Sequence, residues 1–171
     1  MSGRTWATAG SLVAAAVLQV MIAPHIAIGG VVPSVPLLVV ITLALIEGPV
    51  AGSVAGFSGG LLLDMLGTGP IGVWALVLTL VGYLAGLLSE NVFAEGWLLP
   101  VTVALLTGLA AEFFYLLVLA VLGVGVPLGS ALLNVVVPKG VYNAALALLL
   151  YPWLARFLRT DRSIKSFRRL A

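Results

Sequence analysis

Three charged side chains stand far from any other charge in an otherwise apolar chain: Asp64, Glu112 and Lys139. Two carboxylates can act together as general acid and base, whereas opposite charges inside an apolar protein fix a fold or line a ligand pocket. Counted inward from the expected outer loops, Lys139 and Glu112 lie about eight and ten residues deep, within one helical turn of each other. The sequence therefore predicts an ion pair between Lys139 and Glu112, with Asp64 as the alternative partner of Lys139.

Asp64 itself has two interpretations. As an interfacial acid it would cap the turn at 67–70, and as a site residue it would face Lys139. A membrane enzyme that uses Asp64 and Glu112 as a carboxylate pair is disfavoured, because their expected depths differ by roughly 10 Å or more. The single histidine, His25, follows Pro24 without a visible partner and is expected to be an interfacial residue.

The chain has no cysteine and none of the common catalytic or phosphate-binding motifs. We therefore expect no catalytic residue, no metal site and no cofactor.

A regular row of glycines precedes Asp64 in the segment GPVAGSVAGFSGGLLLD. Gly52, Gly56 and Gly60 are four residues apart, so in a helix they share one face, and Asp64 is the next step on it. Each glycine in a helix interior lowers helix stability by about 1 kcal/mol relative to alanine. Small residues at this spacing allow close backbone approach between membrane helices. The row therefore predicts either packing against another helix of this chain or docking of a partner helix.

The composition is that of a membrane protein. Of 171 residues, 62% are hydrophobic and only 8% are charged, against about 25% charged in a soluble domain. Basic residues gather at the C-terminal end, where a tail at 159–171 is expected to be cytoplasmic and to attract anionic lipid, not nucleic acid. They are Arg156, Arg159, Arg162, Lys165, Arg168 and Arg169.

Glycine and proline divide the apolar sequence into six expected membrane spans within residues 1–158. The spans cover about 5–28, 34–47, 49–66, 70–88, 97–122 and 131–157. The second is too short to cross a bilayer without tilt, thinning or burial among neighbours. A kink is expected at Pro138-Lys139-Gly140, near Asn143, whose amide can bond across helices. The sequence thus predicts an all-α bundle of six transmembrane helices with both termini on the cytoplasmic side.

Residues 33–86 resemble the rod shape-determining protein MreD family. The similarity lies in Pro33, the glycine-rich stretch from Gly56 that ends at Asp64, the Ile71-Gly72 step and Gly82-Tyr83. Pro138 and the pair Tyr142-Asn143 in the sixth expected span extend the similarity. Ser34 departs from the family pattern, where an acid or amide is expected after the proline.

This resemblance implies a non-enzymatic scaffold of the elongasome, the assembly that builds the lateral peptidoglycan wall of rod-shaped bacteria. It implies direct binding to MreC, and a place beside MreB, RodA and a class B penicillin-binding transpeptidase in the inner membrane. It also implies a compact bundle similar to the substrate-binding subunits of energy-coupling-factor transporters. The alternative function is therefore a substrate-binding subunit of such a vitamin transporter, with a pocket near Asp64, Glu112 and Lys139.

Overall fold

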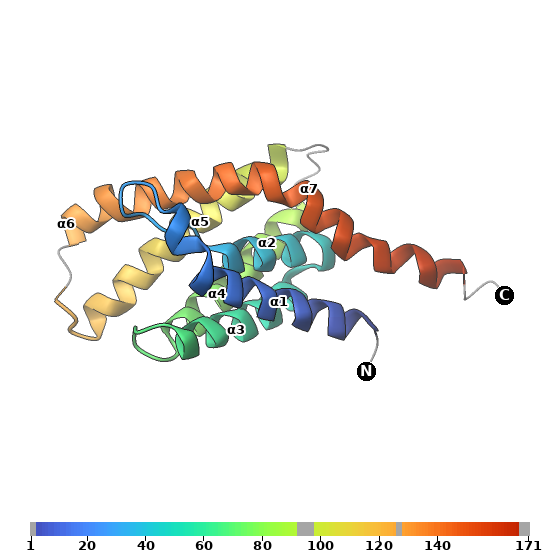
Figure 1. The fold of residues 1–171 in the computed structure, drawn as a ribbon, viewed down its shortest axis with the longest axis horizontal. Helices are drawn as coiled ribbons and strands as arrows, with labels where there is room; N and C mark the ends of the chain where they lie inside the picture. The colour runs from blue at the N-terminus through green and yellow to red at the C-terminus, as the bar shows by residue number, and fades with distance from the viewer. Residues whose placement is uncertain (1–2, 92–97, 126–127, 168–171) are drawn as a thin grey trace.

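A computed structural model describes residues 3–91, 98–125 and 128–167. Within these residues the protein is helical and has no β-strand, apart from an isolated bridge between Ile28 and Val31. The helices are α1 (Gly3–Met21), η1 (Ala23–Ile26), α2 (Val35–Glu47), α3 (Pro49–Leu66), α4 (Val73–Asn91), α5 (Leu98–Val121), α6 (Leu128–Ala131), η2 (Leu132–Val136) and α7 (Val137–Phe167). Both termini lie at the same end of the bundle (Figure 1).

Three stretches of these helices are long and apolar enough to cross a membrane. They are Pro49–Leu66, Val101–Val121 and Gly129–Arg156. Thr8–Met21, Val35–Glu47 and Val73–Leu88 are apolar but shorter. The six long helices follow the order of the six expected spans, and three of them meet the length for spanning within the described residues.

The first helix is shorter than the expected span of 5–28. It ends at Met21, and a 3₁₀ turn and an extended segment then lead back toward α2. The physical reason lies in Pro24, which lacks an N–H and stands in the 3₁₀ turn, and in the Gly29-Gly30 pair. These glycines have φ of 60° and 81°, a conformation that reverses the chain and that other residues rarely adopt.

Helix α2 lies at the centre of the bundle, in contact with α1, α3, α4, α5 and α7. It is apolar on all sides, and ten of its thirteen residues are buried. A helix without a polar face is stable only when surrounded, so this short segment is covered by its neighbours. It ends at Glu47, and Gly48, with φ of 90°, connects it directly to Pro49 at the start of α3.

Helices α6, η2 and α7 follow one another without a break near residues 128–167 (Figure 1). The five residues Leu132–Val136 form a π-helical turn just before Pro138. Pro138 cannot donate a backbone hydrogen bond, and its ring crowds the carbonyl four residues earlier. The irregularity expected at Pro138 is therefore taken up by the wider turn that precedes it. Helix α7 then continues to Phe167, so the segment 159–167 of the expected tail is helical.

Candidate functional site

The glycine row of α3 faces α4, with which α3 shares the largest helix–helix interface of the bundle. A Cβ on Gly52 would overlap the carbonyl of Gly82, one on Gly56 the carbonyl of Leu78, and one on Gly60 the carbonyl of Trp74. The row therefore forms an internal seam, which we call the α3–α4 seam. Because α4 covers this face, these glycines are not open to a partner helix.

The Asp64 carboxylate, at the end of the glycine row, caps the start of α4. Its Oδ2 accepts hydrogen bonds from the backbone N–H groups of Gly72 and Ala75 at 2.9 and 3.0 Å, and its Oδ1 accepts one from Trp74 at 3.1 Å. The first N–H groups of a helix have no partner within it, and the helix dipole favours a negative charge there. Asp64 is buried, so the cap joins the end of α3 to the start of α4 inside the protein.

Replacing Asp64 with alanine is expected to destabilise the fold by about 2 kcal/mol or more, because the N–H groups of Gly72, Trp74 and Ala75, partly or fully buried, lose their acceptor. Asp64→Asn keeps an acceptor oxygen and loses the charge, so its melting temperature should fall between those of wild type and Asp64→Ala. Thermal melting in mild detergent would measure this order. Equal losses in the two variants would show that charge, not acceptor geometry, is what matters.

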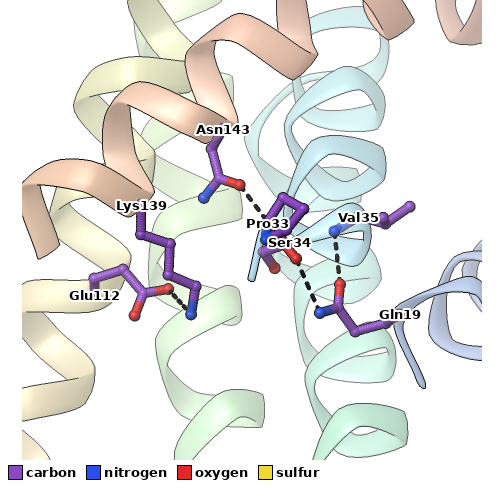
Figure 2. Close-up of polar contacts among 7 residues, drawn as sticks. All are labelled: Gln19, Pro33, Ser34, Val35, Glu112, Lys139 and Asn143. Atoms are coloured by element: carbon purple, nitrogen blue, oxygen red, sulfur yellow. Dashed lines mark hydrogen bonds and ion pairs between the residues drawn. The ribbon is translucent and has the colours of Figure 1, made fainter. Parts of the chain in front are cut away.

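Lys139 and Glu112, the residues expected to pair, are in contact (Figure 2). The Lys139 Nζ on α7 lies 2.7 Å from the Glu112 Oε1 on α5. The Glu112 side chain is 4% exposed and the Lys139 side chain 17%. The carboxylate is thus enclosed between helices, while the ammonium reaches partly exposed space. Asp64, the alternative partner, is instead bound by backbone N–H groups.

Two aromatic rings adjoin the ion pair. Trp74 on α4 and Tyr115 on α5 stack with centroids 4.4 Å apart and planes inclined by 19°. The Lys139 ammonium lies 5.3 Å from the centroid of Trp74, within the range of a cation–π interaction. The ammonium is therefore attracted by the Glu112 carboxylate and by the Trp74 ring.

The buried start of α2 is held by side chains from two other helices (Figure 2). The Gln19 amide of α1 donates to the carbonyl of Pro33 at 2.9 Å and accepts from the N–H of Val35 at 2.8 Å. Asn143 Oδ1, on α7, accepts from the N–H of Ser34 at 2.8 Å. Ser34 makes no side-chain cap of its own, so these two amides supply the partners that a buried helix start requires.

A cavity of about 260 Å³ lies among these groups. Side chains from α1, α3, α4, α5 and α7 contribute to its wall, together with the loop between α3 and α4. Its lining residues are Gln19, Val20, Ser34, Leu63, Asp64, Gly67, Thr68, Gly69, Trp74, Tyr115 and Lys139. The α3–α4 loop lies at the end of the bundle opposite the termini (Figure 1), so we call this space the distal cavity.

The remaining expected site residues are placed as follows. Arg156 is exposed on α7, and Arg159, Arg162 and Lys165 also belong to α7. Arg168 and Arg169 lie outside the described residues. His25 is exposed in η1. Among the described residues no group of three or more His, Asp or Glu side chains could hold a metal ion.

Sequence reasoning missed Gln19, Trp74 and Tyr115. Gln19 carried a usable signal, since a lone amide inside an apolar helix needs partners. Trp74 and Tyr115 carried none, because aromatic residues are common in membrane helices and their stacking depends on how α4 and α5 meet. Their role as walls of the distal cavity is visible only in the structure.

Fold and site together define a compact helical membrane protein, whose buried polar side chains bind helix ends and one another. The chain matches the family model of the rod shape-determining protein MreD over residues 3–160. This match covers most of the sequence, so the protein belongs to the MreD family. That family is named for its part in determining rod shape, not for an enzymatic reaction. No curated protein and no solved structure matches the chain, and the likeness to energy-coupling-factor subunits stays a prediction.

Proposed function

We propose that this protein is a non-enzymatic scaffold of the elongasome that binds MreC directly and helps to control lateral wall synthesis. The observation that carries the proposal is the family match over residues 3–160. MreB, RodA and a class B penicillin-binding transpeptidase are proposed members of the same assembly. We further propose that the protein lies in the inner membrane with both termini cytoplasmic, which the basic residues of the C-terminal segment support.

The packing limits where a partner helix can bind. The α3–α4 seam is closed, so MreC would contact an outward face, where large apolar side chains are exposed. Each of the main outer helices has such a position: Val13 on α1, Phe57 on α3, Leu80 on α4, Leu117 on α5 and Leu149 on α7. In a membrane these side chains face either lipid or a partner helix. A crosslinking residue at each position can distinguish lipid contact from partner contact.

Purification of the tagged protein from its native membranes in mild detergent tests the scaffold function. We expect MreC and wall-synthesis enzymes to copurify. A photo-crosslinking residue at each of the five exposed positions should then give MreC adducts on one face of the bundle and not on the others. Absence of MreC from a well-folded preparation, with no adduct at any position, would contradict the proposal.

The distal cavity favours a second candidate function, a substrate-binding subunit of a vitamin transporter. Asp64 and Lys139 both line this cavity, near where the alternative requires a pocket. The same purification separates the two functions, because a transporter subunit would bring paired ATPases and a second membrane subunit. Calorimetric titration with a panel of vitamins should give no heat if the scaffold function is correct.

A further inference from the structure

We propose that the distal cavity binds a phosphate-bearing ligand of headgroup size, with Lys139 as the residue that contacts the anion. The inference goes beyond the scaffold function and does not depend on MreC. It rests on the cavity itself, on the hydrogen bonds already made by its wall, and on Lys139, the one cation among the described residues that line it.

Among the described residues of the wall, Lys139 is the charged group that has hydrogen-bond donors to offer. An ammonium has three N–H donors. Among the described residues the Lys139 ammonium contacts one carboxylate oxygen, that of Glu112, and the face of Trp74. Further donors of this ammonium are therefore available to an acceptor in the cavity. A lysine ammonium binds phosphate as a point charge.

The two carboxylates near the cavity are already engaged. Both oxygens of Asp64 accept backbone N–H groups at the start of α4, where the helix dipole offsets part of the negative charge. Glu112 is not a lining residue of the cavity and is almost fully buried behind Lys139. The positive end of the ion pair therefore faces the cavity, while its negative end is enclosed between α5 and α7.

The other walls suit a small ligand with an apolar or planar portion. Trp74 and Tyr115 line the cavity as a stacked pair, and Val20 and Leu63 add aliphatic surface. The volume of about 260 Å³ is slightly below the roughly 300–1,000 Å³ of drug-sized pockets. The space therefore suits a phosphate with a few attached carbon atoms.

The wall is also held in place before any ligand enters. Gln19 and Asp64 are both fixed by hydrogen bonds to backbone groups, and Ser34 is fixed through its own N–H. Little side-chain freedom remains to be lost at these positions when a ligand binds, which favours affinity. The hydrogen-bond partners of these three residues come from the start of α2, from α7 and from the start of α4, so the frame of the cavity joins separate parts of the bundle.

The phosphate could come from a free phosphate ester or anion, or from the headgroup of an anionic lipid. Inorganic phosphate represents the first source, and short-chain dioctanoyl phosphatidylglycerol the second. Sodium chloride at matched ionic strength and dioctanoyl phosphatidylcholine are their controls. Ligands that bind the folded state raise its melting temperature in a saturable way, so thermal melting of the full-length protein in mild detergent reports both.

Two variants test the site by different means. The double variant Lys139→Met, Glu112→Leu removes both charges and leaves no unpaired ion, so the fold should persist. Thr68→Phe places a ring at an exposed position of the cavity wall and leaves the ion pair intact. In each variant the half-saturating concentration of the effective probe should rise at least about tenfold.

Stabilisation by inorganic phosphate that both variants lose would support the site with a free anion as its source. Stabilisation by phosphatidylglycerol alone, lost in the same variants, would support it with a lipid headgroup as the source. Stabilisation that persists unchanged in Thr68→Phe would place the anion elsewhere, for example on the basic C-terminal segment, and overturn the proposal. No saturable shift with either probe in the wild-type protein would overturn it as well.

Discussion

Gly56→Leu is expected to abolish the folded bundle, and Gly56→Ala to lower its stability. Even a single Cβ at Gly56 would overlap the carbonyl of Leu78 and lie 2.9 Å from the backbone nitrogen of Thr79. The opposing atoms belong to the backbone of α4, so relief requires moving a whole helix along its largest interface. Overpacking costs about 1–3 kcal/mol where neighbouring side chains can shift. The destabilisation by a leucine at position 56 should be larger, because the atoms it meets belong to the backbone of α4.

The helix propensity of alanine partly opposes this loss, because alanine favours a helix by about 1 kcal/mol over glycine. Gly59→Ala on the same helix is therefore the matched control. Its Cβ would meet the flexible end of Leu12 at 3.2 Å and Val40 at 3.6 Å, which small side-chain shifts can accommodate. Gly10→Ala in α1, with no atom within 4 Å of its Cβ, is a second control.

Melting temperature and monodispersity in detergent would measure the series. We expect Gly10→Ala and Gly59→Ala to behave as the wild type or better, Gly56→Ala to melt lower, and Gly56→Leu to yield little monodisperse protein. Loss of MreC from a normally folded Gly56→Leu protein would contradict the closed seam, because it would mean that the row binds the partner and not α4.

Lys139→Met alone is expected to destabilise the protein by about 3–5 kcal/mol, far more than the double variant Lys139→Met, Glu112→Leu. The single variant leaves the Glu112 carboxylate buried without its counter-ion. Its Oε1 has no hydrogen-bond partner of regular geometry among the described residues, so the ion pair with Lys139 at 2.7 Å compensates the charge at this oxygen. The double variant replaces the pair with apolar groups, a change that is often neutral or stabilising.

A double-mutant cycle with Glu112→Leu completes this prediction. Glu112→Leu alone leaves Lys139 without its carboxylate, yet the ammonium keeps the Trp74 face and partial exposure. The stability lost in Glu112→Leu should therefore be smaller than the stability lost in Lys139→Met. Additive losses in the two single variants, measured by melting in detergent, would show that the two charges do not stabilise each other.

The sequence by itself was enough to predict features that depend on residues adjacent along the chain or on overall composition. Gly48-Pro49 specifies the end of α2 and the start of α3, because glycine tolerates a positive φ and proline fits the first helical turn. The low charge and high hydrophobicity determine a membrane environment, and ordered glycine, proline and tyrosine motifs indicated the MreD family. Lys139 and Glu112 could be paired from the sequence because an unpaired buried charge is costly and their expected depths agreed.

Features that depend on the crossing of helices distant in sequence became visible in the three-dimensional structure alone. The spacing of Gly52, Gly56 and Gly60 required a close neighbour, but not which one, since any backbone fits against a row of glycines. Asp64 stands close to the end of its helix, and the sequence could not distinguish the turn from Lys139 as its partner. Gln19 and Asn143 bind the start of α2 across long stretches of chain, and the distal cavity exists because five helices and one loop meet there without filling it.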